Sequence, residues 1–420
     1  MDLEILKSII VEEQEILQAL RPVERAFAFE DNARYVFVGP RQAGKSYLLY
    51  IRAQQLMAQG HDLKEMLFVN FDDERLIGFK ATDLDQILQA HSALYDCRPT
   101  LFLDEIQNVE GWEHFARRLA NQKYSVYISG SNAKMLSRDI STIMGGRYLE
   151  QAVLPYSFRE YLRACGIHVG ENWHLGKGKG EVQRALTNYL QWGGFPESLL
   201  FADKRRWLNT LYEKIFLGDI MQRNGIRNET SLRLMVQRLA QNIKNPTSYN
   251  RLANMVKATG ASTNVASVID YVQHCKDAFL IFTLENYAAK FVEKETVKKH
   301  YFCDNGLLNI FLTDSETALF ENLCAIHLYG RWLQNPEAEL YYYNKETELD
   351  FYLPGSRTAI QACYNLNDPT TREREVKALV QFHRLYGLGH AQIITLSEEG
   401  TISQDGLDIQ VVPLAKWLLA

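Results

Sequence analysis

Short apolar runs alternate with helical stretches along the first third of the chain. Each run is bounded by polar or glycine-containing segments, and the five runs are Tyr35–Val38, Met66–Phe71, Thr100–Leu103, Tyr124–Ser129 and Tyr148–Leu154. The preceding residues 2–20 carry leucine and isoleucine at helical spacing. Alternation of this kind is typical of a parallel sheet covered by helices on both faces. The fold class expected here is therefore α/β.

The pattern changes after Pro155. From there to about Asn228 the periodicity is helical and no strand stands out. Residues 248–274 have the pattern of two helices around a Thr259-Gly260 turn, as in a helix-turn-helix. Strands return after Tyr301, and the predicted ones are Leu340–Tyr343, Leu349–Leu353, Thr358–Tyr364 and Gln392–Leu396, with a helix near Thr371–Leu385. The chain is therefore expected to hold more than one domain.

Composition is that of a globular protein. The 420 residues are 46% hydrophobic and 23% charged, and 46 basic against 51 acidic residues give a net charge of −5, which does not favour nucleic acid by itself. No stretch of 18 residues lacks a charge, and the acidic start does not resemble a secretory signal. The six cysteines stand far apart. We expect a cytoplasmic protein with reduced thiols and no membrane partner.

Residues 39–46 match the phosphate-loop pattern G-x-x-x-x-G-K-[ST], with a strand before them and the helical stretch Tyr47–Gln59 after them. Backbone N–H groups of such a loop surround phosphates, and the helix N-terminus adds a partial positive charge. The expected nucleotide contacts are Gly39, Pro40, Arg41, Gln42, Ala43, Gly44, Lys45 and Ser46. Lys45 would reach the outer phosphates and Ser46 would ligate Mg²⁺. The alternative is a glycine turn before a helix.

An acidic pair, Asp104-Glu105, follows the apolar strand Thr100–Leu103. Asp104 would hold the magnesium ion, and Glu105 would polarise the water that attacks the terminal phosphoryl group. The alternative is a solvated pair after a buried strand. The strand Met66–Phe71 between the two motifs resembles the additional-strand class of NTPases, which implies ATP rather than GTP.

Two further positions come from the same comparison with NTPase classes. Ser131 or Asn132, after the strand Tyr124–Ser129, would sit beside the γ-phosphate, and we prefer Ser131; a polar turn is the alternative. Arg147 precedes the fifth strand, where ring-forming ATPases place an arginine that reaches the neighbouring subunit's nucleotide. An ordinary surface arginine is the alternative.

Several segments together resemble a family of prokaryotic AAA-type ATPases whose second half is a domain of unknown function. They are GPRQAGKS, LFLDEIQNVEGWEHFARRL, ISGSNAKMLSRDI, GGRY, LPYSFREYL, GGFPE, YFCDNGLLNIFL, LFENL and ETELDFYL. The resemblance implies an ATPase domain at 1–155, a helical lid at 156–228, a winged-helix-like segment at 229–295 and a degenerate endonuclease-like (PD-(D/E)xK) domain at 296–420. It also implies ATP and Mg²⁺ as cofactors and self-association into an oligomer.

DNA contact by the helix-turn-helix has weak support in the sequence. Its second helix offers Asn264 and Gln273 but no Lys or Arg before Lys276, and phosphate contacts need basic side chains. A structural or protein-contact role is therefore preferred and DNA stays open. The basic clusters Lys204–Arg206 and Lys294–Lys299 are interpreted as solvated faces.

The endonuclease-like motif needs a Glu, an Asp and then E-x-K. Glu321 and Asp350 fit, but Gln361 and Cys363 occupy the last two places, so a carboxylate and an ammonium are missing. Lys345 is a weak candidate to replace the lysine. Nuclease activity is therefore not expected.

The function predicted from these residues is Mg²⁺-dependent ATP hydrolysis that drives conformational change in a homo-oligomer. One alternative is a nucleotide-gated DNA-binding or regulatory protein with little turnover. Another is an ATP-dependent nuclease that acts in phage defence. The substrate or partner on which the ATPase cycle acts is not encoded in these motifs.

Overall fold

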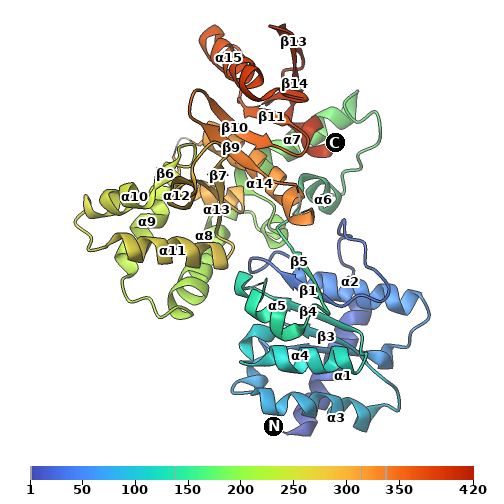
Figure 1. The fold of residues 1–420 in the computed structure, drawn as a ribbon. Helices are drawn as coiled ribbons and strands as arrows, with labels where there is room; N and C mark the ends of the chain where they lie inside the picture. The colour runs from blue at the N-terminus through green and yellow to red at the C-terminus, as the bar shows by residue number, and fades with distance from the viewer. Residues whose placement is uncertain (1, 137, 314, 336–337) are drawn as a thin grey trace. The chain divides into compact units, whose positions relative to one another are not determined.

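The computed structural model describes residues 2–136, 138–313, 315–335 and 338–420. The chain divides into two compact units, Met1–Leu154 and Pro155–Ala420. In Figure 1 the first runs from blue to teal and the second from green to red. Each unit has its own sheet and its own hydrophobic core.

The first unit contains a five-stranded parallel sheet, as the alternating pattern predicts. Its strands are β1 (Tyr35–Val38), β2 (Met66–Asn70), β3 (Thr100–Asp104), β4 (Val126–Gly130) and β5 (Leu149–Ala152), in the order β2-β3-β4-β1-β5. Its helices are α1 (Leu3–Ala19), α2 (Lys45–Ala58), α3 (Leu84–Leu94), α4 (Trp112–Asn121) and α5 (Arg138–Met144). Short 3₁₀ turns lie at Leu63–Glu65, Glu74–Leu76, Ala81–Asp83, Ile106–Asn108 and Ala133–Leu136. The predicted α/β fold class is confirmed.

Aromatic side chains in register hold the strands of this sheet together. Phe68 is paired with Phe102, and Phe102 with Tyr127, across β2, β3 and β4, and their rings stack. Tyr35 on β1 stacks on Tyr127 in the same way. Cross-strand aromatic pairs of this kind stabilise a sheet by roughly 0.2–1 kcal/mol each. These stacked aromatic pairs therefore stabilise the register of the strands. The register in turn determines which strand ends lie side by side.

The strand ends that carry the predicted site lie at one edge of the sheet. Val38 at the end of β1 is paired with Gly130 at the end of β4, and Asn70 is paired with Asp104 at the end of β3. In open α/β sheets ligands bind outside this carboxyl edge. The topology therefore gathers the phosphate loop, the acidic pair and the segment after β4 in one place.

The second unit begins with helices. They are α6 (Phe158–Ala164), α7 (Lys177–Trp192), the 3₁₀ turn Pro196–Leu200, α8 (Lys204–Lys214), a π-helical segment Ile215–Gln222, α9 (Glu229–Gln241), α10 (Tyr249–Lys257) and α11 (Val265–Asp277). Ser248 caps α10 by accepting a hydrogen bond from the Arg251 N–H, as is typical of a serine at this position. The region from Pro155 to Asn228 is helical, as predicted.

A nine-stranded mixed sheet follows. Its strands are β6 (Thr247–Ser248), β7 (Ile281–Asn286), β8 (Val297–Phe302), β9 (Tyr341–Asn344), β10 (Glu348–Leu353), β11 (Thr358–Ala362), β12 (His390–Thr395), β13 (Gly400–Gln404) and β14 (Leu407–Pro413). The order is β13-β14-β12-β11-β10-β9-β7-β8-β6. The remaining helices are α12 (Phe291–Thr296), α13 (Asn305–Asn309), α14 (Glu316–Gln334), α15 (Pro369–Tyr386) and α16 (Leu414–Leu419).

Helix length and hydropathy bear on membrane insertion. Within the described residues, every helix is too short or too polar to cross a bilayer.

Candidate functional site

The loop of residues 39–44 joins β1 to α2 at the carboxyl edge of the first sheet. Gln42 and Gly44 have φ angles of 58° and 93°, in the left-handed region. Glycine adopts this region without steric strain because it has no Cβ atom. A Cβ atom on Gly39 would lie 1.9 Å from the carbonyl oxygen of Val153. Glycine is therefore required at position 39 by close backbone approach, and at position 44 by conformation.

Lys45 is the first residue of α2, and its side chain turns back over the loop. It is 3% exposed, and its Nζ donates a hydrogen bond to the Pro40 carbonyl oxygen at 2.9 Å. The same Nζ lies 3.6 Å from Glu105 Oε1. A buried ammonium is stable only with such partners. The lysine of the phosphate loop and the glutamate of the acidic pair are therefore adjacent.

Asp104 is buried at the end of β3. The Ser129 hydroxyl donates a hydrogen bond to its Oδ1. Burial raises the pKa of Asp104 to about 6, and the charge of Glu105 adds to the rise; hydrogen bonds from Ser129 and Ser46 and the charge of Lys45 oppose it. Ser46 and Asp104, the two predicted metal-binding residues, are thus in direct contact.

Glu105 is fixed by a small polar network. It adopts a φ of 50°, and its Oε2 accepts a hydrogen bond from Gln107 Nε2, which also donates to Ser131 Oγ at 3.2 Å. Burial opposes ionisation of Glu105, but Lys45, Gln107 and Ser131 outweigh it and lower its pKa. Glu105 is therefore held as a carboxylate.

The two candidates after β4 differ in their contacts. Ser131 is buried inside the Glu105–Gln107 network, whereas the Asn132 side chain accepts a hydrogen bond from the Lys134 N–H in a local turn. Sequence reasoning missed Gln107 and Ser129. A serine inside the buried strand β4 was a usable signal for Ser129, because a buried hydroxyl needs a partner.

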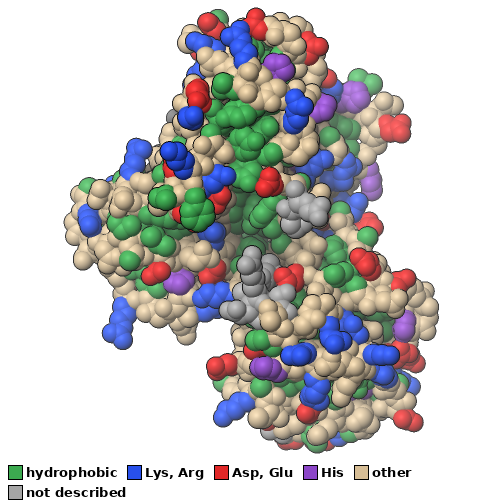
Figure 2. All heavy atoms as spheres, in the orientation of Figure 1, with side chains coloured by type: hydrophobic (Ala, Val, Ile, Leu, Met, Phe, Trp, Pro, Cys, Tyr) green, Lys and Arg blue, Asp and Glu red, His purple; other side chains and the backbone are tan. Residues whose placement is uncertain are grey.

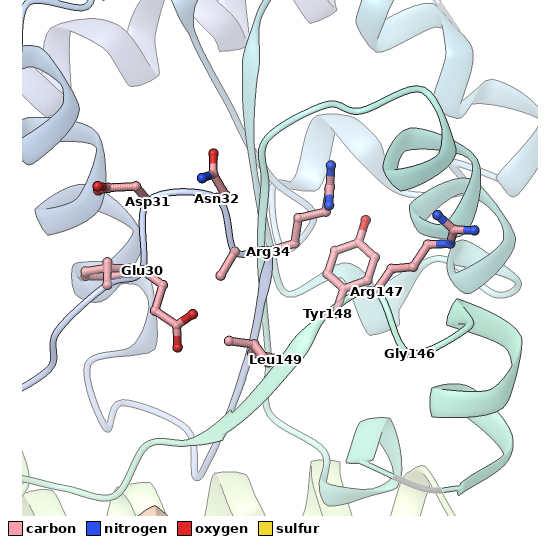
Figure 3. Close-up of a pocket in the computed structure, with 10 residues that line it drawn as sticks. Glu30, Asp31, Asn32, Arg34, Gly146, Arg147, Tyr148 and Leu149 are labelled. Atoms are coloured by element: carbon pink, nitrogen blue, oxygen red, sulfur yellow. The ribbon is translucent and has the colours of Figure 1, made fainter.

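Arg147 lies at the opposite, amino-terminal edge of the sheet. Leu149, two residues later, is paired with Tyr35 at the start of β1. Arg147 is exposed and lines a cavity of about 630 Å³ with residues 29–34. In Figure 3 its guanidinium points away from Glu30 and Asp31. The structure therefore separates Arg147 from the phosphate loop of its own chain.

The visible surface of the first unit has mixed charge. In Figure 2, Lys and Arg side chains are interspersed with Asp and Glu over this face. A polyanion on this face would therefore meet attractive basic and repulsive acidic side chains within short distances of each other.

In the second unit, Glu321 and Asp350 meet around an ammonium that sequence reasoning missed. Lys299 of β8 is fully buried, and its Nζ lies 3.2 Å from Glu321 Oε1 and 3.1 Å from Asp350 Oδ1. The interpretation of Lys294–Lys299 as a solvated face is therefore wrong for Lys299, and also for Lys298, which is buried and pairs with Glu285. Lys298, Lys299 and His300 stand in a row in strand β8, so no alternation of apolar and polar residues marked Lys299 as buried.

The other candidates of the endonuclease-like motif, Gln361, Cys363 and Lys345, lie in different surroundings. Gln361 donates a hydrogen bond to Glu375 Oε2 at 2.8 Å, so a carboxylate from α15 reaches the place where the motif lacks one. Cys363 packs into the hydrophobic core and bonds to the Asn365 carbonyl, and Lys345 is exposed beside Glu346. The motif positions themselves hold Gln361 and Cys363, as predicted, and other elements bring an ammonium, Lys299, and a carboxylate, Glu375, next to Asp350 and Gln361.

The candidate DNA-reading side chains of α11 have local partners. Asn264 caps the helix by accepting a hydrogen bond from the Ser267 N–H, and Gln273 donates to Asp277 at 2.7 Å. These contacts account for both polar residues without a nucleic acid.

Solved structures with related folds align only loosely. Cdc6p from Pyrobaculum aerophilum is 13% identical, over 70% of this chain and 88% of its own, with a TM-score of 0.26. AMPPCP-bound DnaA from Aquifex aeolicus is 14% identical, over 65% and 86%, also with a TM-score of 0.26. At these TM-scores neither structure carries an argument about this protein.

Sequence relatives give a firmer result. Residues 31–162 match the family described as AAA domain, and residues 183–318 match a domain of unknown function. An uncharacterized protein of Methanocaldococcus jannaschii is 31% identical over 99% of this chain and 95% of its own length. One from Haemophilus influenzae is 29% identical over 65% and 67%. The chain belongs to the family of AAA-type P-loop ATPases in which a domain of unknown function follows the ATPase domain.

Proposed function

We propose that the first unit hydrolyses ATP with the help of Mg²⁺. The observation that carries the proposal is the meeting of Lys45, Asp104 and Glu105 at one sheet edge, with Lys45 Nζ 3.6 Å from Glu105 Oε1. A phosphate-binding ammonium, a metal-binding carboxylate and a base are the groups that phosphoryl transfer to water requires. They come from two separate motifs of the sequence.

Each residue of the site would have a separate role in hydrolysis. Backbone N–H groups of the loop and Lys45 would bind the phosphates. Glu105, whose lowered pKa keeps it ionised, would accept a proton from the attacking water, and Ser131 would help to orient that water. Gln107 positions Glu105 through its side-chain amide.

Ser46 and Asp104 fit a magnesium ion. One hydroxyl and one carboxylate in contact, beside a phosphate site, form the oxygen donor set that Mg²⁺ accepts, with water and phosphate oxygens as the other ligands. When bound, the ion would neutralise charge on the phosphates. The raised pKa of Asp104 fits this role, because a buried carboxylate without a cation is unfavourable.

The ion pair between Lys45 and Glu105 suggests a resting arrangement. A phosphate that binds the Lys45 ammonium competes with Glu105 and with the Pro40 carbonyl for the same three protons. Binding of ATP would therefore release the base as it engages the lysine. Coupling of this kind gives the ATP-bound state a different local structure, which can drive conformational change.

Arg147 supports an extension of the proposal to an oligomer. Its exposed guanidinium lies at the sheet edge away from its own phosphate loop, so it is available to a neighbouring chain. We propose that Arg147 acts at the nucleotide of an adjacent subunit. DNA is left out of the proposal, because Asn264 and Gln273 already have partners.

The test is the variant Glu105→Gln in the full chain. We expect ATP binding to be retained and phosphate release to fall at least about 100-fold, the lower end of the effect of a general base. Glu110→Gln is the matched control, because Glu110 is exposed on the same loop. Phosphate release by Glu105→Gln at the parental rate would contradict the assignment.

The oligomer is tested by mixing. Arg147→Ala and Glu105→Gln chains should each be inactive alone. A mixture should regain part of the activity, because some interfaces then combine an intact Glu105 site with an intact Arg147 of the neighbour. Activity of Arg147→Ala equal to that of the parent would remove this part of the proposal.

A further inference from the structure

Arg25 lies on the segment between helix α1 and strand β1, and its side chain joins two distant backbone carbonyl groups. Its Nη1 donates a hydrogen bond to the Ala43 carbonyl oxygen at 2.9 Å, and its Nη2 donates one to the Leu154 carbonyl oxygen, also at 2.9 Å. Ala43 belongs to the phosphate loop, and Leu154 is the last residue of the first unit. One planar guanidinium therefore connects the phosphate loop to the end of this unit.

Aromatic packing anchors the segment that carries Arg25. Side chains at positions 25, 27 and 29 are half-buried, whereas those at 24, 26, 28 and 30 are exposed. The Phe27 ring packs edge-on against Tyr35 and Phe37 of β1, with 5.4 Å between the ring centroids in each pair. Phe29 packs against Phe37 at 5.9 Å. Arg25 is thus on the buried side of a segment that two phenylalanines hold against the sheet.

The hydrogen bond to Ala43 sets the direction of one amide of the phosphate loop. A trans peptide is planar, so its C=O and N–H point in opposite directions. Because the Ala43 carbonyl points to Arg25, the Gly44 N–H points to the other side of the loop. Gly44 directly precedes helix α2, where N–H groups have no acceptor within the helix. Amides in this position bind phosphate oxygens.

Residues 153 and 154 are linked to the phosphate loop at both of its ends. At the start of the loop, the Val153 N–H donates to the Val38 carbonyl oxygen at 2.7 Å, and the Val153 carbonyl leaves room only for glycine at position 39. Near the end of the loop, Arg25 supplies the link from Ala43 to Leu154. A displacement of the loop therefore pulls on Leu154, and the next residue begins the second unit.

The two acceptors distinguish an arginine from a lysine at position 25. A guanidinium presents several N–H groups in a fixed fork and can bind two separated carbonyls at once. An ammonium has a single nitrogen at the end of a flexible chain, so it cannot reproduce both bonds in the same geometry. An arginine that only attracted the negative phosphates could instead be replaced by lysine without loss.

We propose that Arg25 is a positioning residue of the ATP site. It orients the Ala43–Gly44 peptide toward the phosphates, and it couples the phosphate loop to Leu154, the residue that leads into the second unit. The inference rests on the proposed function for the identity of the ligand, and it adds the route by which nucleotide binding is felt along the chain. Arg25 acts through backbone groups of the loop and is not a catalytic residue.

Nucleotide affinity tests the positioning role. Binding of a non-hydrolysable ATP analogue with Mg²⁺ to the full chain is measured by isothermal titration calorimetry. We expect affinity to fall at least about tenfold in Arg25→Met, and at least about fivefold in Arg25→Lys, because neither side chain keeps both hydrogen bonds. Arg21→Met is the matched control and should bind as the parent does. Arg21 is exposed on the same segment, and its guanidinium donates only to nearby carbonyls, those of Gln18 and Leu20.

Amide hydrogen exchange tests the coupling. Without nucleotide, peptides that cover residues 39–46 and 149–156 should exchange faster in Arg25→Met than in the parent, whereas residues 390–395 of β12 should be unchanged. With the analogue at saturation, exchange of residues 149–156 should slow in the parent and stay the same in Arg25→Met. If Arg25→Met raises exchange throughout the first unit, Arg25→Lys takes its place in these comparisons, because it keeps the charge and most of the side chain.

The results separate this inference from the proposed ATPase. Parental affinity in Arg25→Met, or full recovery of affinity in Arg25→Lys, overturns the positioning role while the ATP site stands. Exchange of residues 149–156 that does not respond to nucleotide in the parent, or responds equally in the Arg25 variant, overturns the coupling. A parental chain that binds no ATP analogue overturns the ATP site and this inference together.

Discussion

Replacing Lys299 by methionine should destabilise the second unit by about 3–5 kcal/mol at pH 8, the cost of removing one partner from a buried ion pair. Methionine keeps an unbranched side chain and fills most of the space, so the loss is mainly electrostatic. Both carboxylates that face Lys299 within 3.2 Å, Glu321 and Asp350, would remain with an uncompensated charge. The magnitude applies because Lys299 is fully buried, Glu321 is buried and Asp350 is partly buried.

The loss should depend on pH. Burial holds the pKa of Glu321 at about 7 even with Lys299 present, and removal of the ammonium raises it further. A carboxyl whose pKa is higher in the folded than in the unfolded state weakens folding as pH rises between the two values. Below that window Glu321 is neutral in the folded variant. At pH 5 the penalty should therefore shrink toward the roughly 1–3 kcal/mol of a buried polar group without its partner.

Urea unfolding followed by tryptophan fluorescence measures this effect. Five of the six tryptophans lie in the second unit, so the signal reports mainly on it. Lys345→Met is the control, since Lys345 is 64% exposed beside Glu346, and its stability should change by less than about 0.5 kcal/mol. A Lys299→Met chain as stable as the parent at pH 8, or a loss that is equal at pH 5, would refute the reasoning.

Three further outcomes follow from the ATP site. Gly39→Ala should abolish ATP binding, because its Cβ would overlap the Val153 carbonyl. Thermal unfolding should show a loss of stability of at least about 1–3 kcal/mol. Gly218→Ala is the control, since the space around Gly218 is open, and it should change neither ATP binding nor stability in this way. Gln107→Leu should lower turnover about tenfold with unchanged ATP affinity, and an unchanged rate would show that Gln107 does not position Glu105. MgATP affinity should fall roughly tenfold from pH 7 to pH 5, because the Asp104 pKa of about 6 leaves most of that carboxyl protonated at pH 5; the same fall in Asp104→Asn would exclude this cause.

The sequence was most informative where periodicity and motif agree. All five strands of the first sheet, and helix α2 after the phosphate loop, follow from apolar runs and from G-x-x-x-x-G-K-[ST]. Gln107 could not be found in this way, because its role depends on a turn that returns its side chain to Glu105. A glutamine in a loop has no pattern of its own.

The second unit shows the opposite case. Its motif was read along the chain as Glu321, Asp350, Gln361 and Cys363, but the missing charges come from other elements. Lys299 lies on a strand that the sequence did not separate from its basic surroundings. Spacing along a chain predicts contacts within one hairpin or helix. The partner of a buried carboxylate depends instead on which strands are neighbours in the sheet.

Strand β8 pairs with β6 on one side and with β7 on the other. On one side it pairs with β6, directly before helix α10, through Thr247 and Lys298; the next residue along β8 is Lys299. Backbone hydrogen bonds of a sheet resist sliding, so a partner that tilted α10 would carry β8 with it. A tilt of α10 would therefore move the backbone next to Lys299, whose ammonium pairs with Glu321 and Asp350.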